Sequence, residues 1–413
     1  MKKATVKGTN DYLPKEVRIR DYLQNKILEV YQENGFSRIT TPVIEDAENL
    51  DKSEGGENLN LIFKILKRGE KLEKALEAKK YDELSDMGLR YDLTLPLSRY
   101  FANNRAKLMY PIKCIQIDRV YRAERPQKGR LREFVQCDID ILGSDSYTCE
   151  IELITVTAQA LLAIGMKEFK VKVNNRKILK SVLMKAGFTE DQLDSVCITF
   201  DKLDKVSREG VIAELREKGM SEESITNFAD VLSRGPLELS QLKEMSDDLE
   251  TIETMEKIIA SAKELSGGAY DIVFDLSLVR GQGYYTGSVF EIESTKFRGA
   301  IGGGGRYDNL IGKFTGEAVP AVGFSIGFER IFSILSESQF EIPDSKKKVA
   351  LLYQAEDFVQ AMQKANVLRG EYDVVMYEKP KKVGKFLNRL TEYDFYGYLI
   401  YGEAEEVSAL SKE

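Results

Sequence analysis

Charged and aromatic residues are crowded into a short stretch near residue 125. Five arginines and two glutamates fall between residues 119 and 133, and Phe134 follows them directly. A guanidinium group binds phosphate through two parallel hydrogen bonds, and a carboxylate accepts a hydrogen bond from an exocyclic amine. An aromatic ring can stack on a nucleobase. Arg122, Glu124 and Phe134 therefore suit a nucleotide triphosphate held without a P-loop, with a salt-bridged surface turn as the alternative.

Two strands are expected on either side of this charged loop. β-Branched and aromatic residues fill 114–121, and apolar and polar residues alternate over 134–142. The alternation puts Gln136 and Asp140 on one face of the second strand. Beside a bound nucleotide, these two acceptors suit a small polar ligand with N–H donors, such as an imidazole. Two side chains that simply face water remain the alternative.

Three further groups of residues have the types needed for ligand binding. Arg280 opens a turn with three glycines in seven residues, which also holds Tyr284 and Tyr285. Glycines let the backbone approach a ligand closely, although a glycine-rich hairpin with a packed tyrosine is the alternative. A helix expected over 328–335 presents Arg330 in its first turns. The third group lies in residues 89–96, where strand alternation places Asp92 and Thr94 on one face, with Leu93 between them.

The chain contains no histidine, and this absence excludes several chemistries. Ser-His-Asp and Cys-His arrangements are impossible, and so is a zinc site with histidine ligands. The four cysteines have no CxxC spacing and are expected to be buried free thiols. Positioning and electrostatics must carry any reaction, which suits phosphoryl and nucleotidyl transfer.

Composition indicates a globular protein of two or three domains. The 413 residues are 43% hydrophobic and 31% charged, and no apolar run approaches the roughly 18 residues of a membrane span. The first residues lack the apolar core of a signal peptide, so a cytoplasmic location is expected. A net charge of −7 argues against non-specific coating of nucleic acid.

The order of these motifs resembles that of class II aminoacyl-tRNA synthetases. Arg122, Glu124 and Phe134 match motif 2, and the Gly-x-Glu-Arg pattern ending at Arg330 is similar to motif 3. A long helix followed by residues 35–42 is similar to motif 1, the dimer-forming element. The block around Arg280, with its tyrosine pair and Thr-Gly, resembles the signature of histidyl-tRNA synthetases within that class. Many members carry Leu-Asp before the tyrosine pair, where this chain has Gln282-Gly283.

The resemblance implies a role for each matching residue. The expected catalytic residues are Arg122, Arg280 and Arg330. The expected ATP contacts are Arg122, Glu124, Arg130, Phe134 and Arg330. The expected histidine contacts are Asp92, Leu93, Thr94, Arg122, Gln136, Asp140, Arg280, Tyr284 and Tyr285. It further implies ATP with Mg²⁺, L-histidine and tRNA(His) as partners, a homodimer, no membrane partner, and no metal site built by the chain itself.

The same resemblance implies an α+β fold, with an antiparallel sheet flanked by helices. Residues 1–167 and 268–336 are expected to form the catalytic domain, and 168–267 a helical insertion. Residues 346–413 alternate strand and helix, like a shortened anticodon-binding domain. Their basic cluster is either a solvated charge run or an RNA contact; it comprises Lys379, Lys381, Lys382 and Lys385.

A second activity class is compatible with the same fold. The regulatory subunit of ATP phosphoribosyltransferase resembles these enzymes and senses histidine without charging tRNA. In that subunit the arginines and tyrosines of these motifs are typically replaced, whereas they are intact here. The short C-terminal domain and Gln282-Gly283 keep this alternative open.

Overall fold

The computed structural model describes residues 2–53, 60–127, 129–203, 206–235, 237–279, 284–338 and 340–410. They divide into two compact units, Met1–Phe340 and Glu341–Glu413. In this part of the chain, no helix combines the length and the apolar character needed to cross a bilayer.

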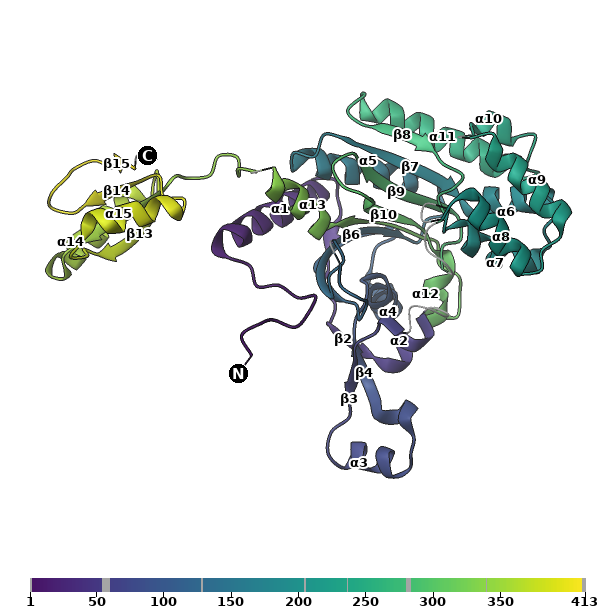
Figure 1. Ribbon diagram of the computed structural model, residues 1–413, viewed down its shortest axis with the longest axis horizontal. Coiled ribbons are helices and arrows are strands. Elements are labelled where there is room, and N and C mark those ends of the chain that lie inside the picture. Colours follow the sequence, from purple (N-terminus) through teal and green to yellow (C-terminus); the bar gives the residue numbers. More distant parts are fainter. Residues whose placement is uncertain are drawn as a thin grey trace. The chain divides into compact units, whose positions relative to one another are not determined.

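An eight-stranded sheet is the centre of the first unit (Figure 1). In spatial order its strands are β1 (Ser37–Arg38), β5 (Ile112–Tyr121), β6 (Glu133–Leu142), β11 (Ala321–Gly327), β10 (Ala300–Arg306), β9 (Ser288–Ser294), β7 (Phe169–Asn175) and β8 (Asp271–Phe274). Pairing is parallel between β1 and β5 and between β7 and β8, and antiparallel between the other neighbours. The α+β fold expected from the sequence is therefore confirmed.

Long helices pack on one face of this sheet. They are α1 (Pro14–Glu33), α5 (Thr148–Ala163) and α11 (Leu249–Ser266). α1 contacts β5 and β6, α5 contacts β6 and β11, and α11 contacts β7 and β8. Ile19, Leu23 and Ile27 recur every four residues along α1 and are buried, as an amphipathic helix requires. The helix-facing residues of β6, such as Cys137 and Ile139, are fully buried as well.

Helices fill the chain between β7 and β8. They are α6 (Arg176–Lys185), α7 (Leu193–Phe200), α8 (Arg208–Glu217), α9 (Glu222–Ser233), α10 (Leu239–Leu242) and α11. Ser207, Ser221 and Asp248 cap the N-termini of α8, α9 and α11 through their side-chain oxygens. The boundary expected at 168 differs from the structure, because β7 pairs with β9 in the central sheet and the helices begin only at Arg176.

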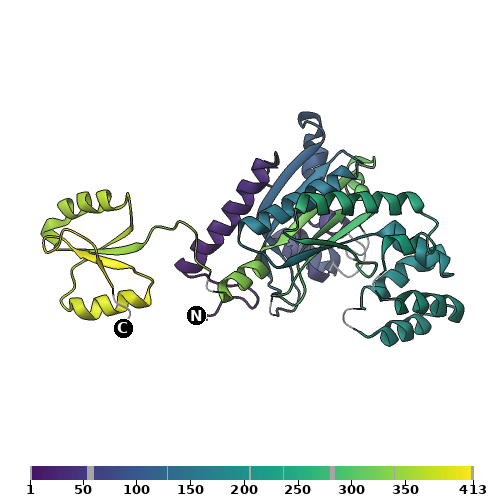
Figure 2. The ribbon, with the colours of Figure 1, turned by 90° about the horizontal axis from the view of Figure 1, so that it is seen from above.

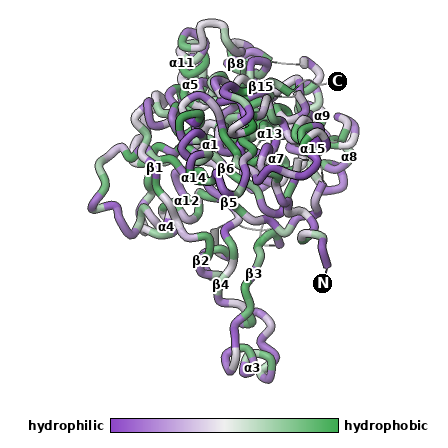
Figure 3. The backbone as a smooth tube through the Cα atoms, turned by 90° about the vertical axis from the view of Figure 1, so that its left-hand side faces the viewer, coloured by the Kyte–Doolittle hydropathy of each residue, from purple (hydrophilic) through white to green (hydrophobic). Residues whose placement is uncertain are grey.

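A small three-stranded sheet carries a projecting hairpin. It contains β2 (Ile44–Asp46), β4 (Ser85–Leu89) and β3 (Lys64–Leu66), and α3 (Glu70–Glu77) lies at the tip of the hairpin, away from the central sheet (Figure 3). The remaining helices of this unit are α2 (Ala47–Ser53), α4 (Thr94–Asn104), α12 (Asp308–Thr315) and α13 (Phe328–Glu337).

The strand expected around Asp92 and Thr94 is wrong. β4 ends at Leu89, and Thr94 is the first residue of α4. Asp92 Oδ1 accepts a hydrogen bond from the Leu95 amide at 3.1 Å. A carboxylate that satisfies a free amide at a helix start favours the helix over a continued strand.

The second unit is a four-stranded sheet between two helices (Figure 2). Its elements in chain order are β12 (Lys348–Tyr353), α14 (Phe358–Leu368), β13 (Asp373–Glu378), α15 (Val383–Glu392), β14 (Gly397–Ile400) and β15 (Ser408–Ala409). Val349 and Leu351 belong to one apolar cluster, and Ala350 and Leu352 to another. The alternation along β12 therefore covers both faces of the sheet with apolar contacts. The expected alternation of strand and helix is confirmed.

A buried ion pair ties the central sheet to α5. Arg306 Nε and Nη2 each donate to the Glu150 carboxylate at 2.7 Å. The two side chains are 11% and 3% exposed. Removing one charge of such a pair leaves the other buried without its partner.

Glu150→Gln is expected to lower the free energy of unfolding by about 3 kcal/mol, because the Arg306 charge stays buried. Urea denaturation followed by tyrosine fluorescence measures this loss. Glu70→Gln is the control, since Glu70 and its partner Lys74 are both exposed, and it should leave the transition unchanged. Equal transitions for the two variants would contradict the stabilising role of the buried pair.

Candidate functional site

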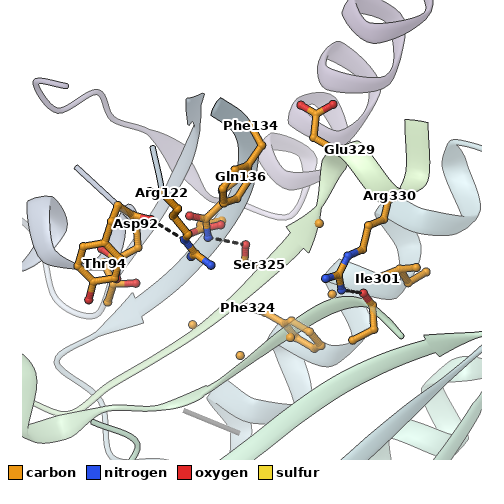
Figure 4. Close-up of a pocket in the computed structure, with 18 of the residues that line it drawn as sticks. Asp92, Thr94, Arg122, Phe134, Gln136, Ile301, Phe324, Ser325, Glu329 and Arg330 are labelled. Atoms are coloured by element: carbon orange, nitrogen blue, oxygen red, sulfur yellow. Dashed lines mark hydrogen bonds between the residues drawn. The ribbon is translucent and has the colours of Figure 1, made fainter. Parts of the chain in front are cut away.

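A cavity of about 540 Å³ lies in the first unit, beside the polar face of β6 (Figure 4). Its walls come from β6, β10 and β11, from the first residues of α4 and α13, and from the loop between β5 and β6. Strands and helix starts hold the lining residues at defined positions, which a binding site requires.

Strand β6 supplies a row of cavity-lining side chains. Phe134, Gln136, Asp138 and Asp140 occupy alternate positions and all line the cavity. The alternation therefore puts Gln136 and Asp140 on the same face, as predicted. Asp138 was missed, although the same period of two would have found it.

Glycines in β10 and β11 allow these two strands to lie close to each other and to the side chains of this row. A Cβ atom on Gly304 of β10 would lie 2.0 Å from the carbonyl oxygen of Gly323 on β11. A Cβ atom on Gly323 would lie 1.9 Å from Asp140 Oδ1. Side chains at these positions would displace Asp140 or part the strands, so the glycine-rich run of β10 is a steric requirement of the site.

Two arginines face the cavity from different elements. Figure 4 shows Arg122 and Arg330 on opposite sides, with both guanidinium groups directed toward the space between them. Arg122 Nε donates to the Tyr91 carbonyl at 3.0 Å, and its guanidinium lies 5.0 Å from the centre of the Phe134 ring. Arg330, in the first turn of α13, donates to the Ala300 carbonyl. The motif 2 and motif 3 arginines are therefore brought to one cavity.

The loop between β5 and β6 adds a charged pair to the cavity. Glu124 and Arg130 both line it, and Arg130 Nη1 lies 3.3 Å from Glu124 Oε2. Arg132 Nε donates to the Glu124 carbonyl at 3.1 Å, which fixes the backbone of the loop. An acceptor and a donor are thus presented next to Phe134.

Three buried carboxyl groups line the same cavity. Burial raises the pKa of Asp140 to about 7, raises that of Asp138 well above its ordinary value, and raises that of Asp92. The Tyr307 hydroxyl donates to Asp140 Oδ1 at 2.6 Å, and Arg122 is a nearby cation that favours ionised Asp92 and Asp138. A ligand with a cationic or N–H group would stabilise the ionised carboxylates.

Two acceptors near these carboxyls are unsatisfied among the described residues. Gln136 Oε1 and Asp138 Oδ1 are buried and have no hydrogen-bond partner. Gln136 Nε2 donates to Ser325 Oγ at 3.2 Å, so the amide presents its oxygen elsewhere. Buried acceptors without partners are costly unless a ligand supplies the donors.

A cluster of three tyrosines lies beside Asp140 in the cavity. The rings of Tyr284 and Tyr285 lie 4.4 Å apart, and Tyr284 lies 6.4 Å from Tyr307. All three tyrosines line the cavity. Tyr307 was also missed, because its contact with Asp140 joins residues 167 positions apart in the sequence.

The structure brings most of the predicted site residues to this one cavity. Those that line it are Asp92, Thr94, Arg122, Glu124, Arg130, Phe134, Gln136, Asp140, Tyr284, Tyr285 and Arg330. Leu93 differs from the prediction: its side chain is fully buried, and it is not among the lining residues. Arg280 and the Gln282-Gly283 pair lie outside the described residues.

A protein-built metal site is not found in the described ranges, where no group of three or more Cys, Asp or Glu residues is arranged to hold an ion.

Known proteins similar to this chain are histidyl-tRNA synthetases. The sequence model described as "Histidyl-tRNA synthetase" matches residues 8–331. A histidine–tRNA ligase of Leifsonia xyli is 42% identical over 360 residues, covering 84% of this chain and 83% of that protein. A histidine–tRNA ligase of Cytophaga hutchinsonii is 35% identical over 418 residues, covering 97% and 92%.

One solved structure is similar to this chain in fold and sequence, and another in fold alone. The crystal structure of histidyl-tRNA synthetase from Nostoc sp. PCC 7120 superposes with a TM-score of 0.79 at 26% identity, covering 96% of this chain and 91% of that chain. A Bacillus halodurans structure titled as an ATP phosphoribosyltransferase regulatory subunit/histidyl-tRNA synthetase has the same TM-score of 0.79 at 21% identity and shows the shared fold alone. The match over residues 8–331 and the identity over most of the chain show that this protein belongs to the histidyl-tRNA synthetase family.

Proposed function

We propose that this chain is a histidine–tRNA ligase, which activates L-histidine with ATP and transfers it to tRNA(His). One observation carries the proposal: a single cavity is lined by two guanidinium groups that face each other, by three buried carboxyl groups and by a tyrosine cluster. Relatives named histidine–tRNA ligase, at 34–42% identity over most of the chain, support it.

The two arginines that face each other across the cavity are suited to ATP, which enters with Mg²⁺ as the substrate complex. The adenine ring stacks on Phe134, and Glu124 accepts from its exocyclic amine, with Arg130 beside it. Arg122 holds the α-phosphate, and Arg330 holds the γ-phosphate. Preorganised guanidinium groups stabilise negative charge as it builds on phosphorus, and they need no reorganisation during the reaction.

The buried carboxyl groups and the tyrosines of the cavity are suited to histidine. Asp92, Thr94 and the free oxygen of Gln136 accept from the α-ammonium group. Asp140 accepts from an imidazole N–H, and Tyr284 and Tyr285 close over the ring. We assign Leu93 a packing role beneath Asp92, because its side chain is buried.

The reaction follows from holding both substrates along β6. A carboxylate oxygen of histidine attacks the α-phosphorus, a new P–O bond forms, and the bond to the bridging oxygen breaks to release pyrophosphate. A hydroxyl of the terminal ribose of tRNA then attacks the carbonyl carbon, and AMP leaves. Arg280 is proposed to act with Arg122 on the α-phosphate and the histidine carboxylate, from the family resemblance alone.

The second unit is proposed to contact tRNA. Lys379, Lys381 and Lys382 lie between β13 and α15, and Lys385 lies in the first turn of α15. Lys379 pairs with Glu403, and the other three lysines are exposed, where they can meet RNA phosphates. The homodimer and the cytoplasmic location stay predictions from the sequence.

A histidine-sensing subunit without ligase activity is the alternative function. It shares the fold, but the names of the similar ligases and the intact cavity arginines favour the enzyme. The two functions differ in one assay, because both bind histidine and only the ligase forms an adenylate.

The proposal predicts histidine-dependent exchange of labelled pyrophosphate into ATP. Exchange should require histidine and should not occur with any of the other standard amino acids. The reaction is measured with radiolabelled pyrophosphate and purified protein. Histidine binding by calorimetry without exchange would instead identify the sensing function.

Arg122→Ala is expected to lower kcat for exchange by about 10²–10³-fold, since one preorganised donor to the transition state is lost. Arg119→Ala is the matched control, because Arg119 lies three residues before Arg122, in β5, with its side chain 64% exposed. Steady-state kinetics should show the control within about twofold of wild type. Equal losses in the two variants would argue against an α-phosphate contact at Arg122.

Asp140→Asn is expected to change how stability depends on pH. The folded protein holds the Asp140 proton up to a pKa of about 7, whereas the unfolded chain releases it near the ordinary aspartate value. Between these values the folded state binds more protons, so this group lowers stability as pH rises, by up to about 1.4 kcal/mol per pH unit.

Urea titrations from pH 4 to 8 measure this dependence, and Asp140→Asn should flatten it between about pH 5 and 7. The comparison between the two proteins isolates Asp140 from Asp92 and Asp138, whose pKa values are also raised. Parallel curves for wild type and variant would show that Asp140 titrates normally.

A further inference from the structure

Glu329 is held by donors from three distant parts of the chain. Arg20 Nη1 and Nη2 donate to its two oxygens at 2.6 and 2.7 Å. The Val135 amide donates to Oε1 at 3.2 Å, and the Tyr12 hydroxyl donates to Oε2 at 3.3 Å. The carboxylate therefore joins the N-terminal segment, α1 and β6 at the start of α13.

Arg20 is fixed in place by aromatic rings as well as by Glu329. Its guanidinium lies 4.0 Å from the centre of the Tyr12 ring, 4.9 Å from that of Phe328 and 5.1 Å from that of Phe332. The side chains of Arg20 and Glu329 are each 10% exposed. A planar fork packed between rings makes two parallel hydrogen bonds that a lysine ammonium cannot reproduce.

Glu329 and the Val135 amide that it binds are sequence neighbours of Arg330 and Phe134, which are assigned to opposite ends of the proposed ATP site. Glu329 directly precedes Arg330, and Figure 4 shows the two side chains pointing in opposite directions from the start of α13. The Val135 amide that Glu329 accepts from directly follows Phe134. The same carboxylate thus ties the backbone beside Arg330 to the backbone beside Phe134.

We propose that Arg20, acting through Glu329, is a positioning residue that sets the spacing between Phe134 and Arg330. Arg20 is not among the residues that line the cavity, so it touches neither substrate. The proposal rests on the function proposed above for the identity of the two ends, adenine at Phe134 and γ-phosphate at Arg330.

Correct spacing matters for a ligand that spans both ends and not for one that uses a single end. ATP would contact Phe134 and Arg330 together, whereas AMP lacks the γ-phosphate and would contact only the Phe134 end. Histidine would contact the buried carboxyl groups and the tyrosines, and neither Phe134 nor Arg330. A change in this spacing therefore lowers kcat/KM for ATP selectively, since small misplacements of bound groups have large effects on reaction rate.

The test compares Arg20→Lys and Glu329→Gln with wild type in histidine-dependent pyrophosphate exchange. Both variants should lower kcat/KM for ATP by about tenfold or more, with KM for histidine and Ki for AMP within about twofold of wild type. Arg20→Lys keeps the charge and Glu329→Gln keeps the shape, so both conserve the fold better than alanine would.

Glu150→Gln is the matched control, because it breaks another buried bidentate pair of the same unit. It should lower stability without a selective change in ATP kinetics. Lys26→Met, at a side chain of α1 that is 33% exposed, should change neither the stability nor the ATP kinetics.

Three results would overturn the proposal. ATP, AMP and histidine parameters that shift by one common factor would show a purely structural role, as would failure of both variants to fold. Unchanged kinetics would show no role at all. If wild type lacks histidine-dependent exchange, the proposed function is wrong. The positioning role is then tested separately by calorimetry, which should show that the variants lose affinity for ATP and keep their affinity for AMP.

Discussion

Strand β6 imposes the constraint on which the rest of the site depends. Its residues alternate between the helix-covered face of the sheet and the cavity, and the chain rises about 3.4 Å per residue. Phe134, Gln136, Asp138 and Asp140 therefore form a row about 20 Å long, from an aromatic ring to a buried carboxyl group. A nucleotide and an amino acid joined end to end need a surface of this kind, with different chemistry at each end.

Groups of opposite charge share the cavity. Arg122 and Arg330 come from separate elements and face the space between them. Asp92, Asp138 and Asp140 are buried in the same cavity, where burial raises their pKa values and the Arg122 cation favours ionised Asp92 and Asp138. Such a site is costly when empty and is stabilised by ligands that carry both anionic and cationic groups.

Parts of this arrangement follow from local sequence patterns. The period of two over 134–142 predicted the shared face of Gln136 and Asp140, and the helix predicted over 328–335, with Arg330 in its first turns, is α13. The same pattern failed at Asp92 and Thr94, because a hydrogen bond at the start of α4 outweighs strand propensity there. Asp138 was within reach of the alternation rule and was missed.

Other contacts have no local signature. Arg20 and Glu329 are 309 positions apart, and Tyr307 and Asp140 are 167 apart. Only the folded sheet and its helices bring these side chains together, so spacing along the chain carries no information about them. The close approach of Gly323 to Asp140 is equally a property of strand pairing between β6 and β11.

ATP and histidine are proposed to occupy one cavity together, along β6. A stable analogue of histidyl-adenylate, with a non-hydrolysable link between the histidine and adenosine parts, tests this arrangement through its inhibition pattern in pyrophosphate exchange. Inhibition should be competitive against both ATP and histidine. Competition with one substrate and non-competitive inhibition against the other would contradict it.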